Sequence, residues 1–140
     1  MSEKNFSIKL KYVIYAPPSK VFEALTKSST ISKWSGQSGK VSPEKNGAFE
    51  LFDGWVKGEV KEFNPAKKLS YTWKPAEWDK KTTPSLVTYV FKEHKAGTEI
   101  FLEHSGFPNK EESEKHESGW IDYVFEPLND YFVSIAEISG

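Results

Sequence analysis

The feature that most constrains the fold of this chain is an alternating strand that runs straight into two prolines. Between residues 6 and 14, apolar residues alternate with polar ones, a period of two that predicts a half-buried β-strand. Pro17 and Pro18 end that strand, because proline has no N–H to donate to a sheet. The chain therefore leaves the strand conformation early, and the residues that follow have a helical pattern.

Residues 19–34 predict two short helices in succession. Ser19 is a good N-cap for a first helix that extends to about Thr26. Ser29 or Thr30 is expected to cap a second helical turn, which ends on Trp34. Two short helices directly after a first strand narrow the fold sharply, and we expect them to close one end of a curved sheet.

The middle of the chain predicts short strands connected by turns. Asp53-Gly54 is a strong hairpin signal, and Asn64-Pro65 and Lys95-Ala96-Gly97 mark further turns. The segment from Pro75 to Pro84 is polar and bounded by prolines, so it is expected to be a loop. Between these breaks the sequence predicts five strands, at residues 48–52, 55–63, 69–73, 86–92 and 98–104.

The end of the chain predicts a long amphipathic helix. Asn109 followed by Glu112 forms a capping-box pattern. From Trp120 to Ile138, apolar residues recur at a spacing of three and four, on one face of a helix about 28 Å long. Pro127 lies inside this helix and is expected to remove one hydrogen bond and bend it. The order of elements predicts an α+β fold in which a curved antiparallel sheet wraps around the terminal helix.

Composition excludes several classes of function. The chain has 140 residues, which suits a single domain spanning residues 1–140, and no cysteine, which excludes disulfide and thiolate chemistry. All 19 basic residues are lysines and the net charge is −1. Without arginine, which donates bidentate hydrogen bonds to phosphates, nucleic acid is not expected as a partner and an anionic ligand is disfavoured. No segment resembles a membrane span or a secretory signal, so we expect no membrane partner and a cytoplasmic location.

The aromatic side chains are the candidate ligand surface. Trp34, Trp73 and Trp120 could form walls of an apolar cavity, because tryptophan combines a large ring with one N–H donor. Each is also compatible with plain core packing, which is the more common role of such rings. Trp78 lies in a loop and could form the mouth of a cavity or tether its own loop. The full set of cavity candidates is Trp34, Phe49, Trp73, Tyr89, Leu102, His104, Trp120 and Val124.

The sequence contains no catalytic or metal-binding motif. His94, His104 and His116 do not have the spacing of a metal site, so no metal and no cofactor is expected. His94 and His116 have charged neighbours in the sequence and are expected to be solvated. His104 lies on the inward face of its strand, where it could orient a ligand. Alternatively, it is a core histidine whose partner is a backbone carbonyl or Ser105.

Several segments, taken in order, resemble a known family. They are residues 16–26 (APPSKVFEALT) with Trp34, 58–65 (GEVKEFNP), 69–73 (LSYTW), 98–107 (TEIFLEHSGF) and the pair Gly119-Trp120. Together they resemble the helix-grip, Bet v-like fold of the START/SRPBCC superfamily. Within that superfamily the chain is similar to the domain of the heat-shock-protein-90 ATPase activator homologue type.

This resemblance implies an apolar cavity between the sheet and the terminal helix, because the superfamily uses such cavities for lipids, hormones and polyketides. The first hypothesis is therefore that the chain binds a small hydrophobic molecule that remains to be identified. The second is a chaperone-interacting module, although we expect no counterpart in this sequence to the separate N-terminal region of the eukaryotic activator. The third is a cavity-type enzyme such as a cyclase, for which His104 is the only candidate acid or base and no catalytic residue is assigned.

Overall fold

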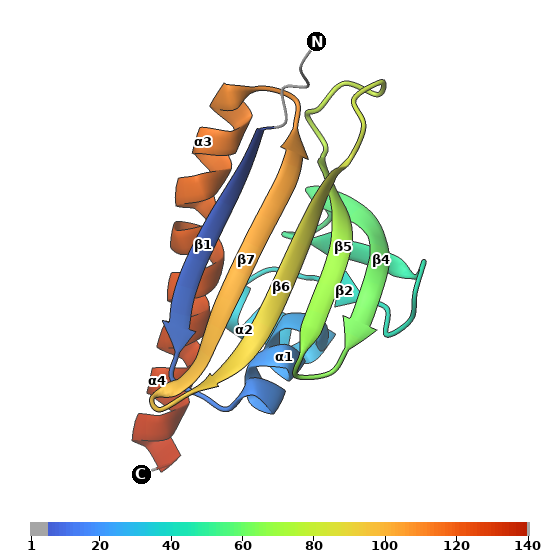
Figure 1. Cartoon of the computed structure of the whole chain (residues 1–140). Helices are drawn as coiled ribbons and strands as arrows, with labels where there is room; N and C mark the ends of the chain where they lie inside the picture. The colour runs from blue at the N-terminus through green and yellow to red at the C-terminus, as the bar shows by residue number, and fades with distance from the viewer. Residues whose placement is uncertain (1–5, 140) are drawn as a thin grey trace.

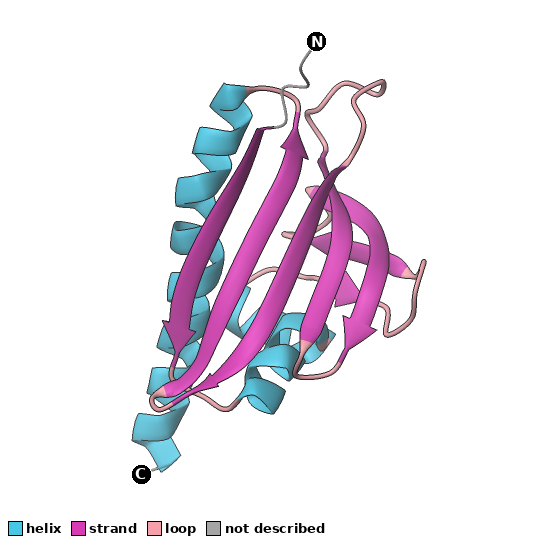
Figure 2. Ribbon diagram, viewed as in Figure 1, coloured by secondary structure: helices cyan, strands magenta, loops and turns pink. Residues whose placement is uncertain are grey.

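The computed structural model describes residues 6–139, which form a curved antiparallel sheet with the helices on one of its faces (Figures 1 and 2). The strands are β1 (Phe6–Ile14), β2 (Lys40–Val41), β3 (Ala48–Leu51), β4 (Val56–Asn64), β5 (Lys68–Pro75), β6 (Ser85–His94) and β7 (Gly97–Phe107). The helices are α1 (Pro18–Thr26), α2 (Ser28–Ser35), α3 (Lys110–Gly119) and α4 (Glu126–Ser139), with a π-helical turn, η1 (Trp120–Phe125), between the last two. This is the α+β helix-grip architecture that the sequence predicts.

The sheet brings the first and last strands of the chain together. Its seven strands follow the order β1-β7-β6-β5-β4-β3-β2, and every neighbouring pair is antiparallel. In the pairing of β1 with β7, Ile8 lies opposite His104 and Leu10 opposite Leu102. The period of two that marks β1 in the sequence therefore places one set of side chains of both strands toward the helices.

Both short helices form, but their starts differ from the prediction. α1 begins at Pro18, so the expected cap Ser19 lies inside its first turn, and Pro17 at the N-cap position makes no side-chain cap. Proline suits the first helical position, because it has no N–H there to satisfy and its φ already matches a helix. α2 starts ahead of Ser29 and Thr30, again without a side-chain cap.

The C-terminal helix is longer than predicted, because α3, η1 and α4 follow one another without a break (Figure 1). The predicted cap is confirmed at its start, where the Asn109 side chain accepts a hydrogen bond of 2.9 Å from the backbone N–H of Glu112. A π-helical turn, η1, lies just ahead of Pro127, where the sequence predicts a lost hydrogen bond and a bend. There the backbone N–H of Glu126 donates to the carbonyl of Ile121, five residues back.

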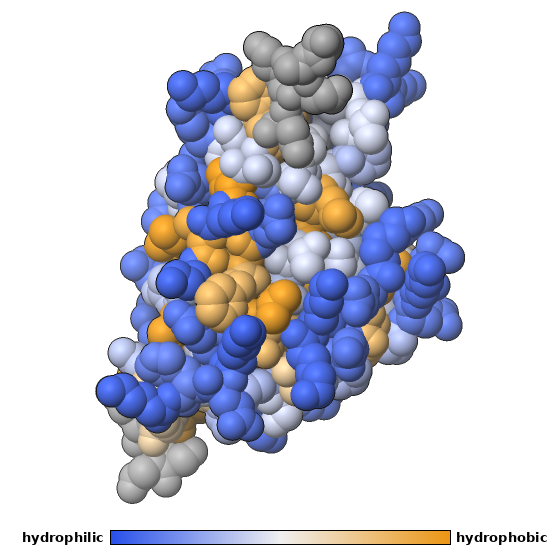
Figure 3. Space-filling view, viewed as in Figure 1, coloured by the Kyte–Doolittle hydropathy of each residue, from blue (hydrophilic) through white to orange (hydrophobic). Residues whose placement is uncertain are grey.

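The two faces of the sheet differ in character. The face shown in Figure 3 carries hydrophobic side chains that are interrupted by hydrophilic ones. Part of this apolar surface is covered by lysines: the Nζ atoms of Lys11 and Lys92 lie 6.0 and 5.5 Å from the ring centre of Phe101. The opposite face packs against the helices and contributes to one core of buried apolar residues. In the described part of the chain, no helix has the length and hydropathy needed to cross a membrane.

Candidate functional site

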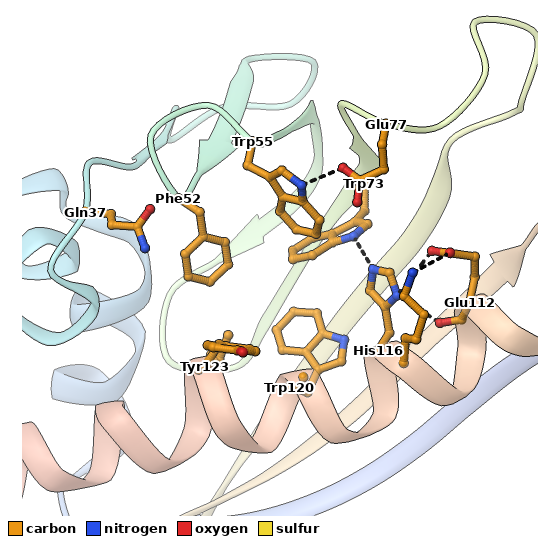
Figure 4. A pocket seen from close by; sticks show the side chains of 12 residues that line it. Gln37, Phe52, Trp55, Trp73, Glu77, Glu112, His116, Trp120 and Tyr123 are labelled. Carbon is orange, nitrogen blue, oxygen red and sulfur yellow. Dashed lines mark hydrogen bonds and ion pairs between the residues drawn. The ribbon is translucent and has the colours of Figure 1, made fainter.

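A pocket of about 450 Å³ opens where the C-terminal helix passes the β3–β4 turn and the end of β5 (Figure 4). The helix contributes one side of it and the sheet, with its turns, contributes the other. The lining residues are Gln37, Phe52, Trp55, Trp73, Glu77, Glu112, Lys115, His116, Gly119, Trp120, Tyr123 and Val124.

A tight turn between β3 and β4 supplies two of the rings. Phe52 and Asp53 both have positive φ angles, 54° and 58°, which reverse the chain within a few residues. The turn is held to the segment after α2, since the Asp53 carboxylate accepts a hydrogen bond of 2.8 Å from the backbone N–H of Ser38. Phe52 and Trp55 consequently lie on the same side of the turn, with their ring centres 6.2 Å apart.

Two tryptophans from opposite sides of the pocket form its inner wall. Trp73 comes from β5 and Trp120 from the π-helical turn, and their ring centres are 5.0 Å apart. Both side chains are buried. Each indole N–H donates to a histidine: Trp73 to Nε2 of His116 at 3.1 Å, and Trp120 to Nδ1 of His104 at 3.0 Å.

These bonds determine the protonation of both histidines. Because an indole N–H can only donate, Nε2 of His116 and Nδ1 of His104 carry no proton. Each other ring nitrogen then donates: His116 Nδ1 to the carbonyl of Glu112 at 2.9 Å, and His104 Nε2 to Oγ of Ser85 at 2.8 Å. The Ser85 hydroxyl donates in turn to the carbonyl of Trp73. Both histidines are therefore neutral.

Burial favours the same neutral state. It lowers the pKa of His104 well below the ordinary value of 6.5, and the nearby His116 lowers it further. Burial also lowers the pKa of His116, against the opposing effect of its bond to the Glu112 carbonyl and of the Glu112 charge. The two rings lie 5.3 Å apart, centre to centre. They fix the two tryptophans of the inner wall without adding charge to it.

The expectation that His116 is solvated is wrong. Its side chain is only 9% exposed, whereas its sequence neighbours Lys115 and Glu117 are exposed. Charged neighbours in a helix point in other directions, so they do not report on the environment of the residue between them. His94, the last residue of β6, is partly exposed, and its Nδ1 accepts from the backbone N–H of Ala96.

Two carboxylates hold tryptophans at the edge of the pocket. Glu77 Oε1 accepts from the Trp55 indole at 2.6 Å, and Glu112 Oε1 accepts from the Trp78 indole at 2.9 Å. Glu112 Oε2 also binds Nζ of Lys115 at 3.1 Å. Burial acts to raise the pKa of Glu112, but the hydrogen bonds from Trp78 and Lys115 outweigh it and lower the pKa. Trp78 does not line the pocket and tethers its loop to α3.

The structure separates the eight cavity candidates into two groups. Trp73, Trp120 and Val124 line the pocket. The other five are buried in the core and do not line it: Trp34, Phe49, Tyr89, Leu102 and His104. In this group Trp34 donates its indole N–H to the carbonyl of Ala24, which joins α2 to α1. Ser85, rather than Ser105, is the partner of His104.

Sequence reasoning missed several lining residues. Phe52 and Trp55 come from a turn, where no periodicity marks a side chain as facing inward. Tyr123 had a usable signal, because it follows Trp120 by three residues and so lies on nearly the same helix face. The chemistry of the pocket is thus aromatic, with two carboxylates and one lysine. Within residues 6–139, no group of three or more His, Cys, Asp or Glu side chains could hold a metal ion.

Comparison with known proteins identifies related sequences and folds. The mouse protein named Activator of 90 kDa heat shock protein ATPase homolog 1 is 26% identical over 125 residues, which cover 89% of this chain and 36% of the mouse protein. The chain thus spans about a third of the length of the curated relatives it matches.

Two solved structures share the fold over nearly their whole length. A protein from Mesorhizobium loti has a TM-score of 0.79 and 28% identity over 92% of this chain and 98% of its own. An HSP90 activator from Plasmodium falciparum has a TM-score of 0.73 and 28% identity, and the match covers 89% of this chain and 92% of that one. Residues 15–132, most of the chain, match the sequence profile of the family described as Activator of Hsp90 ATPase homolog 1-like protein, and the chain belongs to this family.

Proposed function

We propose that this chain binds a small, largely apolar molecule in the pocket between the C-terminal helix and β5. The observation that supports this function is the aromatic lining of a pocket of about 450 Å³. Ligand sites commonly have volumes of about 300–1,000 Å³ and are lined by apolar and aromatic side chains with a few polar groups.

The exposed rings strengthen the proposal. Trp55 is 37% and Tyr123 67% exposed, although both line the pocket. When a ligand covers such apolar surface inside a concave site, the surface is removed from water, and this lowers the free energy of the complex. Trp73 and Trp120 are in contrast buried and held by hydrogen bonds, so the inner wall is formed before any ligand arrives.

The test is a thermal-shift screen with a library of lipids and aromatic compounds, followed by calorimetry on those that raise the melting temperature. A ligand that binds only the native state must stabilise it. Tyr123→Ala should weaken binding by about 1 kcal/mol, or roughly fivefold in Kd, because one aromatic contact is lost.

Tyr15→Ala is the matched control, since Tyr15 is also well exposed but does not line this pocket. It should leave the affinity unchanged. If no compound raises the melting temperature, or if both variants weaken binding equally, the proposed site is wrong.

A second candidate function is contact with a heat-shock-protein-90 chaperone. It is supported by the names of the relatives, which include an activator homolog from mouse and an HSP90 activator from Plasmodium falciparum. Pull-down of the chaperone from the same organism, followed by an ATPase assay, would test it. Binding together with a raised ATPase rate is expected, and no binding at high concentrations of both proteins would exclude it.

A further inference from the structure

Three charged side chains line the pocket, and two of them neutralise each other. Lys115 Nζ lies 3.1 Å from Glu112 Oε2, while Glu112 Oε1 accepts from the Trp78 indole. Both oxygens of Glu112 and the charge of Lys115 are therefore already engaged inside the protein. Among residues 6–139, this lysine is the only cation that lines the pocket, so an anionic ligand would have to compete with Glu112 for it.

Glu77 is the carboxylate of the pocket without an ion pair, although its charge also acts on Lys115 and His116. Its Oε1 accepts from the Trp55 indole at 2.6 Å, but an indole N–H is neutral and leaves the carboxylate charge in place. Among residues 6–139, no lysine forms an ion pair with Glu77, and its second oxygen has no hydrogen-bond partner. Figure 4 shows this carboxylate at the edge of the pocket, next to the ring of Trp55.

The surrounding aromatic rings also favour a positively charged ligand. The faces of Trp55, Trp73 and Trp120 carry negative electrostatic potential and attract cations that lie within about 6 Å of the ring centre. His116 adds no positive charge, because its Nε2 accepts from Trp73 and its neutral form is the one held. The pocket thus combines aromatic faces with one carboxylate that forms no ion pair among residues 6–139.

We infer that the ligand is an apolar molecule bearing an amine cation, with its ammonium group beside Glu77 and Trp55 and its apolar body against Tyr123 and Trp120. This inference rests on the proposed function, and it adds the chemical class of the ligand. The absence of arginine from the chain and the engagement of Lys115 disfavour the carboxylate or phosphate analogue of the same molecule.

Three probes with one apolar body test the inference: naphthylethylamine, naphthylethanol and naphthylacetate, each titrated by calorimetry. The amine should bind about tenfold more tightly than the alcohol, and the acetate more weakly than either. Because Glu77 is exposed, the preference for the amine should narrow when the salt concentration is raised.

Glu77→Gln should weaken binding of the amine about tenfold and so remove its preference over the alcohol. Glu117→Gln is the matched control: Glu117 is an exposed glutamate of α3 that does not line the pocket, so this variant changes the net charge equally and should retain the preference. Thermal unfolding of both variants checks that they fold, and the salt dependence of the unmodified protein tests the inference without any substitution.

The outcomes separate the inference from the function on which it rests. If the alcohol binds as tightly as the amine, the cation inference is wrong and the proposed binding function stands. If Glu117→Gln removes the preference as completely as Glu77→Gln does, only the net charge matters and the site is wrong. If none of the three probes binds, the cation inference is overturned, and the thermal-shift screen decides separately on the proposed function.

Discussion

At the scale of single residues, buried polar side chains form hydrogen-bonded pairs. Trp73 with His116 and Trp120 with His104 are two such pairs, and the hydroxyls of Tyr71 and Tyr89 form a third. In the described part of the chain, every buried side-chain nitrogen or oxygen has a hydrogen-bond partner. The removal of one partner therefore leaves the other buried without a bond, which costs more than the loss of both.

The tyrosine pair allows a direct test of this asymmetry. Tyr71→Phe or Tyr89→Phe alone should lower the free energy of unfolding by about 1–3 kcal/mol, because the remaining hydroxyl is buried and unpaired. The double variant should lose less than the sum of the two, measured by urea unfolding in a double-mutant cycle. Tyr123→Phe, at an exposed position, is the control and should change stability very little. Strictly additive losses would show that the two hydroxyls do not depend on each other.

The buried histidines predict how stability depends on pH. Burial holds the pKa of His104 well below 6.5, and that of His116 is also lowered, so below about pH 6.5 the unfolded chain binds more protons than the folded one. Stability should be greatest above this pH and fall as the solution is acidified. The slope is at most about 1.4 kcal/mol per pH unit for each histidine.

Urea unfolding between about pH 7 and pH 5 measures this slope before carboxylates contribute. The pKa of Glu112 is lowered from 4.5, so the stability that its ionised form contributes is lost only in more acidic solutions. A free energy of unfolding that stays constant down to about pH 5 would contradict neutral, buried histidines.

At the scale of elements, the start of α3 positions part of the pocket. Asn109 caps this helix, and Glu112 and His116, which line the pocket, follow within its first two turns. Asn109→Ala should lower the free energy of unfolding by about 1 kcal/mol, since the N–H of Glu112 loses its acceptor. Asn109→Asp keeps a side-chain oxygen at the cap and should retain most of the stability. Equal losses for both variants in urea unfolding would show that the cap bond is unimportant.

The elements also show which structures a sequence pattern can predict. The long strands were predictable because one face of each is buried, so a period of two appears in the sequence. β2 was missed because two residues are too few to show any period. The cap of α3 was predicted, but its helical body was not, because α3 has a polar surface, buries only Ser113 and His116 and so has no apolar stripe.

At the scale of the whole molecule, the pocket was harder to predict than the fold. A pattern of inward-facing residues marks Trp73 and Phe49 equally, yet only Trp73 lines the pocket. The difference arises where the π-helical turn brings Trp120 against β5 and where the β3–β4 turn adds Trp55. Such contacts between distant segments are not encoded in local periodicity, so the sequence predicts the inward set but not which members meet an open space.

The continuity of the core predicts how the whole chain unfolds. Residues from the first strand, both short helices, the central strands and the terminal helix belong to one buried cluster, which includes Ile8, Leu25, Trp34, Trp73 and Leu128. We propose on this basis that the chain is a single domain, and we expect one cooperative transition. Trp34, Trp73 and Trp120 are buried, so tryptophan fluorescence reports on the contact between helices and sheet, and far-UV circular dichroism reports on the elements themselves. The two signals should change at the same urea concentration. A fluorescence transition that precedes the circular dichroism transition would show that the terminal helix separates from the sheet as an independent unit.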